Sequence, residues 1–192
     1  GLVPSWAKDP AIGNRMINAR LETAAQKPAY RRAFARRRCL VPADGYYEWY
    51  TPQGDEQGGE RGGGRPRKQP FYIRRPDGDP LALAGLYEFW RPADSDPADP
   101  NAWVTSMTLL TTSAPDDTGR IHDRAPLMIG RDHWAAWLDP TVTDPAQVGE
   151  VLAPAAPGLL EAYPVRTLVN SVRNNGPELV DPAPPDDVLV LS

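Results

Sequence analysis

Three polar residues lie in apolar or glycine-bearing stretches and are candidates for acid–base or hydrogen-bonding chemistry: Asn18 in INARLET, Glu48 in DGYYEW and His122 in IHDRAP. A carboxylate between Tyr47 and Trp49 on a strand is costly to bury unless it is paired. Burial raises the pKa of a carboxyl group and a neighbouring imidazole lowers it again, so a Glu48–His122 pair could transfer protons near neutral pH. The pattern leaves two other interpretations open: an outward-pointing strand residue for Glu48, and a turn histidine that caps backbone groups for His122.

The remaining histidine and the single cysteine are expected to be structural. His133 begins an amphipathic helix beside Trp134, and Cys39 opens an apolar strand after a run of arginines. One cysteine excludes an intrachain disulfide and any multi-cysteine metal site, and two histidines leave few ligands for zinc. We therefore predict metal-free chemistry, and nothing in the sequence implies an organic cofactor.

The elements that must position these residues follow from hydrophobic spacing and turn signals. Apolar or alternating runs predict strands at residues 39–42, 46–50, 70–74, 81–90 and 103–112, the first two forming a hairpin-like pair. Helical spacing predicts short helices at 28–38, 131–138 and 145–152. Successive strands joined by short turns favour an α+β fold, built around an antiparallel, barrel-like β-sheet with short flanking helices. A length of 192 residues suits one domain or two small ones.

Most of the positively charged residues are arginines, and several of them are clustered. The net charge is -4, yet only three of the 21 basic residues are lysines, so 18 are arginines, which bind phosphate through a planar fork of donors. Five of them occupy residues 31–38, where we expect a solvated helix face. The segment 54–67 contains six glycines and no large apolar residue, which predicts a mobile, dispensable loop. No apolar run approaches the ~18 residues that span a bilayer, so we expect a cytoplasmic protein, nucleoid-associated if bacterial.

Four separated motifs resemble the SRAP (SOS response-associated peptidase) family and occur in that family's order. They are NARLETA at 18–24, RRRCLVPADGYYEW at 36–49, LTTSA at 110–114 followed by IHDRAPLM at 121–128, and VNSVRNNGPEL at 169–179. The resemblance implies a protein of the DNA damage response that binds abasic sites in single-stranded DNA. It also implies a covalent DNA–protein crosslink, in which an N-terminal cysteine condenses through its α-amine with the sugar aldehyde and closes a thiazolidine ring with its thiol.

The resemblance also assigns roles to residues of this chain. Asn18 matches the residue that holds the amine or carbinolamine, while Glu48 and His122 match the groups that move protons. The positions that match DNA contacts are Arg20 and Arg124 for phosphates, Trp6 and Trp49 for the exposed nucleotide, and Thr111 for a further polar contact.

One departure from the family pattern concerns the start of the chain. The sequence opens at GLVPSWAKD, inside a motif that the family reaches only after Met-Cys-Gly-Arg and further strands. We therefore expect a domain at 1–180 that lacks its N-terminal segment, a Pro-rich acidic tail at 181–192, and no crosslinking, because Cys39 has no free amine. The expected partner is single-stranded DNA with abasic sites, bound by a monomer and without a membrane. Two alternatives remain open: a cysteine-type (auto)peptidase, and a noncatalytic single-stranded-DNA-binding module.

Overall fold

The computed structural model describes residues 1–51, 68–150, 152 and 158–188. The predicted glycine-rich loop at 54–67 lies outside these residues. The chain forms two compact units, each assembled from three segments. The first unit comprises Gly1–Ala43, Leu81–Ser113 and Arg124–Ala155, and the second comprises Asp44–Pro80, Ala114–Asp123 and Ala156–Ser192. The predicted domain boundary at residue 180 stays a prediction.

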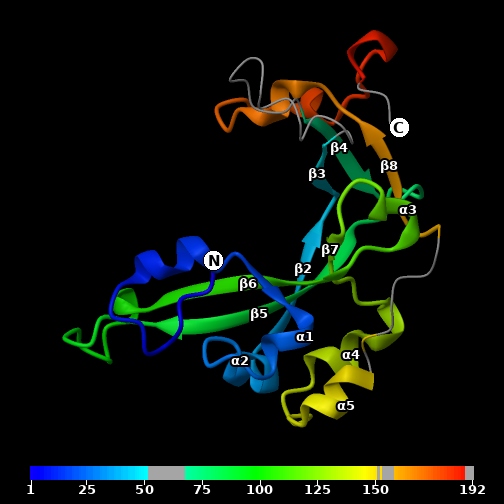
Figure 1. The fold of residues 1–192 in the computed structure, drawn as a ribbon. Coiled ribbons are helices and arrows are strands. Elements are labelled where there is room, and N and C mark those ends of the chain that lie inside the picture. Colours follow the sequence, from blue (N-terminus) through cyan, green and yellow to red (C-terminus); the bar gives the residue numbers. More distant parts are fainter. Residues whose placement is uncertain (52–67, 151, 153–157, 189–192) are drawn as a thin grey trace, which may run out of the picture. The chain divides into compact units, whose positions relative to one another are not determined.

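The first unit is built on a five-stranded sheet with the order β1-β6-β5-β2, in which β7 also pairs with β6. Figure 1 shows β5 and β6 side by side as long strands, and their pairing is antiparallel, whereas β1 runs parallel to β6. The strands are β1 (Asn18–Arg20), β2 (Arg38–Ala43), β5 (Leu81–Trp90), β6 (Val104–Ser113) and β7 (Arg124–Pro126). The parallel β1 was not among the predicted strands.

Short helices pack beside this sheet and bury its core. The α-helices are α1 (Leu21–Ala24), α2 (Arg31–Arg36), α4 (Trp134–Leu138) and α5 (Pro145–Glu150), and the 3-10 helices are η1 (Pro10–Arg15), η3 (Pro100–Ala102) and η4 (Arg131–His133). Leu86, Leu110 and Trp137 are fully buried and belong to one hydrophobic cluster, to which Phe34 of α2 and Val148 of α5 also contribute. The apolar faces of these helices therefore close over the sheet.

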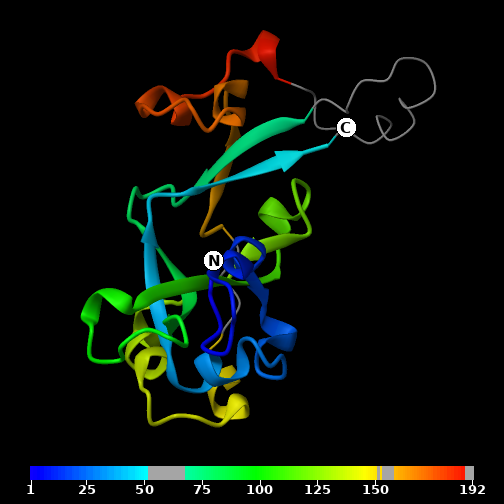
Figure 2. The same cartoon turned by 90° about the vertical axis from the view of Figure 1, so that its left-hand side faces the viewer.

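The second unit is built on a three-stranded sheet with the order β3-β4-β8, and both of its pairings are antiparallel. Figure 2 shows β3 and β4 side by side. Its elements are β3 (Tyr46–Tyr50), β4 (Gln69–Arg74), β8 (Glu161–Pro164), α3 (Asp116–Gly119), η5 (Thr167–Asn170), η6 (Pro177–Val180) and η7 (Pro185–Asp187). Phe71, Ile73 and Val165 are buried in its core.

The α+β class is confirmed, but besides the parallel β1 three details differ from the sequence predictions. Among the described residues, the strand pairings close neither sheet into a barrel. The predicted hairpin is wrong, because β2 pairs with β5 through Arg38↔Leu86 to Ala43↔Leu81, and β3 pairs with β4 in the other unit. The turn at Asp44 and Gly45 therefore carries the chain from one unit into the next.

The third difference concerns the arginine run. Arg31, Arg32 and Arg36 are exposed on α2 as predicted, but Arg38 is only 6% exposed and begins β2. Its guanidinium donates to the carbonyl oxygens of Phe34, Ala35, Trp137 and Asp139. The buried charge of Arg38 is tolerated because backbone carbonyl oxygens accept hydrogen bonds from the guanidinium. Arg37 is half-buried and donates to Glu88 Oε2 at 2.6 Å.

Within the described residues, no helix combines the length and the apolar character that crossing a bilayer requires.

Candidate functional site

Four of the predicted site residues gather around one end of β6 in the first unit. Thr111 pairs with Arg20 of β1 on one side and with Pro126 of β7 on the other. Asn18 and Arg20 are exposed while Ala19 between them is buried, so they lie on the same face of β1. Arg124 begins β7 and donates through Nη2 to the carbonyl oxygen of Thr111 at 2.6 Å and to its Oγ1 at 3.2 Å.

Glu22, which had no predicted role, joins three of these four residues. We call Arg20, Glu22, Thr111 and Arg124 the basic cluster. Arg124 donates through Nη1 and Nη2 to the two carboxylate oxygens of Glu22, at 2.7 and 3.0 Å. This bond to Arg124 is the main reason that the pKa of Glu22 lies below its ordinary value. The Arg124 guanidinium, which is predicted to bind a phosphate, is therefore hydrogen-bonded to a carboxylate of similar geometry. The pattern NARLET placed Glu22 four residues after Asn18, but no local signal connects it with Arg124.

The second unit brings Glu48 and His122 within electrostatic range of each other. Glu48 lies on β3, where burial raises the pKa of its carboxyl, and the charge of His122 opposes that rise. The His122 side chain is 46% exposed, and its Nδ1 lies 3.3 Å from Oδ1 of Asp123. A half-buried carboxyl beside an imidazole can both accept and return a proton. Glu48 is half-buried on β3, and its role in proton transfer stays a prediction.

Tyr46 is a further residue of this group that the sequence prediction missed. Burial and the nearby charge of Glu48 raise the pKa of its phenol far above the ordinary value, so it stays protonated, and it hydrogen-bonds with Thr118. Alternation along the strand could have found it, because residues two apart on a strand share a face. Tyr46 and Glu48 thus combine a neutral hydroxyl and a titratable carboxyl on one side of β3.

The two predicted aromatic residues occupy different units. Trp49 ends the DGYYEW motif on β3 and donates through Nε1 to Oδ1 of Asn170 at 2.7 Å, which fixes its indole against η5. Trp6 is 59% exposed in the first unit and lines a cavity there. Asn18 and Trp6 belong to one unit and the Glu48–His122 pair to the other, so the convergence of Asn18 with that pair stays a prediction.

The cysteine and the second histidine have the environments of structural residues. Cys39 lies on β2, where burial raises the pKa of its thiol, and its Sγ would be 2.8 Å from a Cβ built on Gly85. His133 ends η4 directly before α4 and is half-buried. Within the residues that the structure describes, no three His, Cys, Asp or Glu side chains gather as a metal site would require.

Comparisons with known proteins support one family. The chain is 37% identical over 183 residues to the abasic site processing protein YoqW of Bacillus subtilis, covering 94% of this chain and 73% of the relative. It is 32% identical over 205 residues to the abasic site processing protein HMCES of Gallus gallus, covering 95% of this chain and 55% of the relative. A crystal structure of a protein from Bacteroides thetaiotaomicron superimposes with a TM-score of 0.78 at 26% identity, covering 95% of this chain and 74% of that one.

The sequence model of one family, described as SOS response associated peptidase (SRAP), matches residues 1–172, which include the basic cluster and the Glu48–His122 pair. This chain belongs to the SRAP family.

Proposed function

We propose that this chain recognises abasic sites in single-stranded DNA and contributes to their processing in the DNA damage response. The observation that carries the proposal is the Glu48–His122 pair, in which a desolvated carboxyl and an imidazole interact within the residues that match the SRAP family. Relatives at 29–39% identity that bear the name abasic site processing protein support it.

The basic cluster is the proposed phosphate contact. Arg20 is exposed beside Thr111, and Arg124 presents its guanidinium in the same cluster. Because Glu22 already accepts two hydrogen bonds from Arg124, a DNA phosphate has to displace Glu22 or share the guanidinium with it. Trp6 and Trp49 are the proposed stacking residues for unpaired bases, since stacking on aromatic rings tolerates any sequence.

The Glu48–His122 pair is the proposed proton shuttle. An abasic deoxyribose must open its ring to expose the aldehyde, and condensation of an amine with that aldehyde releases water. The first step moves a proton from the C1′ hydroxyl to the ring oxygen, and the second delivers a proton to the departing hydroxyl. A carboxyl with a raised pKa and an imidazole suit both transfers near neutral pH. Asn18 is the proposed hydrogen-bonding partner of the amine or carbinolamine.

The covalent step of the proposal requires a cysteine with a free α-amine. Its thiol would add to the imine carbon while the imine nitrogen takes up the thiol proton, which closes the thiazolidine ring. Cys39 cannot supply this chemistry, because its nitrogen is an amide within β2 and burial raises the pKa of its thiol. A polypeptide of these 192 residues should therefore hold abasic DNA reversibly.

The test is fluorescence anisotropy with a single-stranded oligonucleotide that carries one abasic site, over a range of salt concentrations. Arg20→Ala should weaken binding and reduce the slope of log K against log[salt] by about 0.7, the value for one phosphate contact on a single strand. Arg31→Ala, an exposed arginine on α2, is the matched control and should leave the slope unchanged. An unchanged slope in Arg20→Ala, or an equal loss in Arg31→Ala, would place the DNA elsewhere.

The proton shuttle needs a separate readout. Glu48→Gln keeps the size of the side chain and should preserve reversible DNA binding. Parallel incubation with a short peptide examines the peptidase alternative, and cleavage that depends on Glu48 would favour it over abasic-site chemistry.

A further inference from the structure

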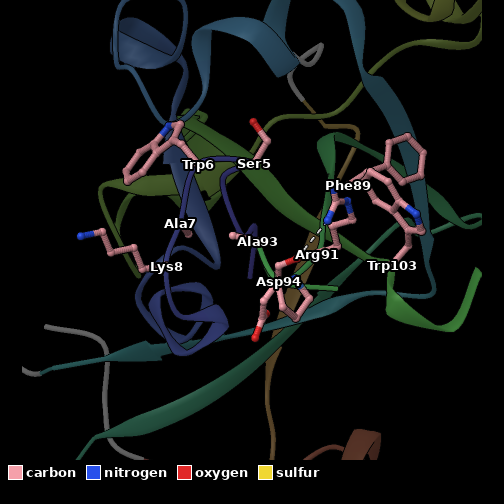
Figure 3. A pocket seen from close by; sticks show the side chains of 10 residues that line it. Ser5, Trp6, Ala7, Lys8, Phe89, Arg91, Ala93, Asp94 and Trp103 are labelled. Atoms are coloured by element: carbon pink, nitrogen blue, oxygen red, sulfur yellow. Dashed lines mark hydrogen bonds between the residues drawn. The ribbon is translucent and has the colours of Figure 1, made fainter. Parts of the chain in front are cut away.

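A cavity of about 740 Å³ in the first unit lies outside the basic cluster, and its lining includes Trp6, one of the two proposed stacking residues. Trp6 and Lys8 border one side of it, and Phe89, Arg91 and Trp103 border the other (Figure 3). Its volume falls within the range of about 300–1,000 Å³ that is typical of small-ligand sites. We call it the aromatic pocket.

The aromatic side chains of this pocket present their rings to solvent. Trp6 is 59% exposed, Phe89 45% and Trp103 42%, whereas Trp90 on the same strand as Phe89 is buried. Isolated exposed apolar residues are ordinary, but three aromatic rings around one cavity are typical of a surface that receives a flat apolar ligand.

The walls of the pocket are held in place by hydrogen bonds. Trp90 donates through Nε1 to the carbonyl oxygen of Ala7 at 2.7 Å, which fastens the segment bearing Trp6 to the end of β5. Arg91 donates through Nη1 to the carbonyl oxygen of Ser95 at 2.9 Å, and its guanidinium lies 5.5 Å from the ring centre of Trp103. The pocket is thus formed before any ligand arrives, which lowers the entropic cost of binding.

The charges of the pocket favour an anionic ligand. Lys8 and Arg91 line it with positive charge, and Asp94 is the acidic residue among its lining side chains. A flat apolar ring attached to a negative charge is the chemistry of a nucleotide, whose base stacks on aromatic side chains while cations attract its phosphate.

The pocket and the basic cluster lie towards opposite ends of β6. Trp103 directly precedes Val104, the first residue of the strand, and Thr111 lies near its last residue. At about 3.4 Å per residue, the strand rises about 24 Å from Val104 to Thr111. A stacked nucleic-acid strand also advances about 3.4 Å per nucleotide, so this span corresponds to about seven nucleotides.

We propose that the aromatic pocket binds an unpaired nucleotide of the same single strand whose phosphate the basic cluster contacts, about seven nucleotides away. This inference rests on the proposed function, because it assigns a second contact to the DNA that the site receives. It predicts that affinity rises when the strand is long enough to reach both places.

The test compares two single-stranded oligonucleotides by anisotropy, one with two nucleotides and one with ten nucleotides on each side of an abasic site. Phe89 is the best position to change, because its exposed ring lies on β5. Phe89→Tyr keeps an aromatic ring at this position, whereas Phe89→Leu keeps an apolar side chain and removes the ring. Phe89→Leu should weaken binding of the long oligonucleotide by about 5- to 100-fold and leave the short one unchanged. Phe89→Tyr should bind both as the unmodified chain does.

Leu138→Ala is the control for loss of an exposed apolar side chain in the same unit, and should bind both oligonucleotides normally. Unchanged binding of the long oligonucleotide by Phe89→Leu would overturn the pocket proposal and leave the proposed function standing. Equal losses on both lengths would also overturn it, because the ring would then act at the basic cluster. Failure of the unmodified chain to bind either oligonucleotide would instead refute the proposed function, and the pocket proposal with it.

Discussion

Replacement of Arg38 should destabilise the first unit strongly although a sequence pattern places this residue on a solvated helix face. Its guanidinium donates to carbonyl oxygens of α2, of α4 and of Asp139 directly after α4, at 2.5–2.9 Å, and lies 5.5 Å from the centre of the Trp137 ring. Arg38→Met keeps an unbranched apolar side chain but leaves those carbonyl oxygens without their donor. Leaving a buried hydrogen-bond acceptor unsatisfied costs about 1–3 kcal/mol, and several carbonyl oxygens lose their donor together in this variant.

The measurement is thermal unfolding followed by circular dichroism. For a chain of this size, about 1 kcal/mol corresponds to about 2–4 °C, so the melting temperature of Arg38→Met should fall by roughly 10 °C. Arg36→Ala is the matched control, because Arg36 lies in the same arginine run and is exposed. It should shift the melting temperature by no more than about 2 °C. A drop in Arg38→Met as small as that of the control would show that the buried network contributes nothing.

Three further predictions concern titratable groups. Glu22→Gln should tighten DNA binding by about fivefold, because a unit charge about 4 Å from a guanidinium is worth about 1 kcal/mol in water; weaker binding would mean that Glu22 positions Arg124 instead of competing for it. Glu48→Gln should raise the melting temperature at pH 7 and leave it unchanged at pH 4. The reason is that burial raises the pKa of Glu48 in the fold, so its stabilising contribution is present below its ordinary value of 4.5 and is lost as pH rises through the folded pKa. Cys39 should react with iodoacetamide more slowly in the folded chain than in urea at pH 8, because burial raises the pKa of its thiol; equal rates by mass spectrometry would contradict this.

Local signals in the sequence predicted most individual elements but not their partners. Alternation and apolar runs located β4, β5 and β6 to within one residue at each end. The turn at Asp44 and Gly45 is a strong local hairpin signal, yet β2 pairs with a strand that begins at Leu81. Pairing over such a separation depends on which apolar faces fit together in three dimensions, and no window of a single sequence contains that information. The parallel strand β1 has three residues, too few for a period to be visible.

For the candidate site too, the sequence named individual residues but not the residues that they contact. Motifs named Glu48 and His122, and the structure adds the burial that raises the pKa of the Glu48 carboxyl. Nothing local predicted that Arg38 would be buried, because its acceptors come from the ends of two helices about a hundred residues apart. The bond between Arg124 and Glu22 is equally long-range. It means that a DNA phosphate at Arg124 has to displace the Glu22 carboxylate or share the guanidinium with it. Residue types therefore indicated the chemistry, while the tertiary fold determined which groups are engaged.

We propose that this chain holds abasic DNA through its own residues and that Cys39 plays no covalent part. The most direct measurement incubates the 192-residue chain with a labelled abasic oligonucleotide and with the same strand carrying thymidine, then analyses each mixture on a native gel and after boiling in detergent. We expect a native complex that prefers the abasic strand and disappears on boiling, for the unmodified chain and for Cys39→Ser alike. Equal affinity for both strands, or an adduct that survives boiling and is lost in Cys39→Ser, would contradict it.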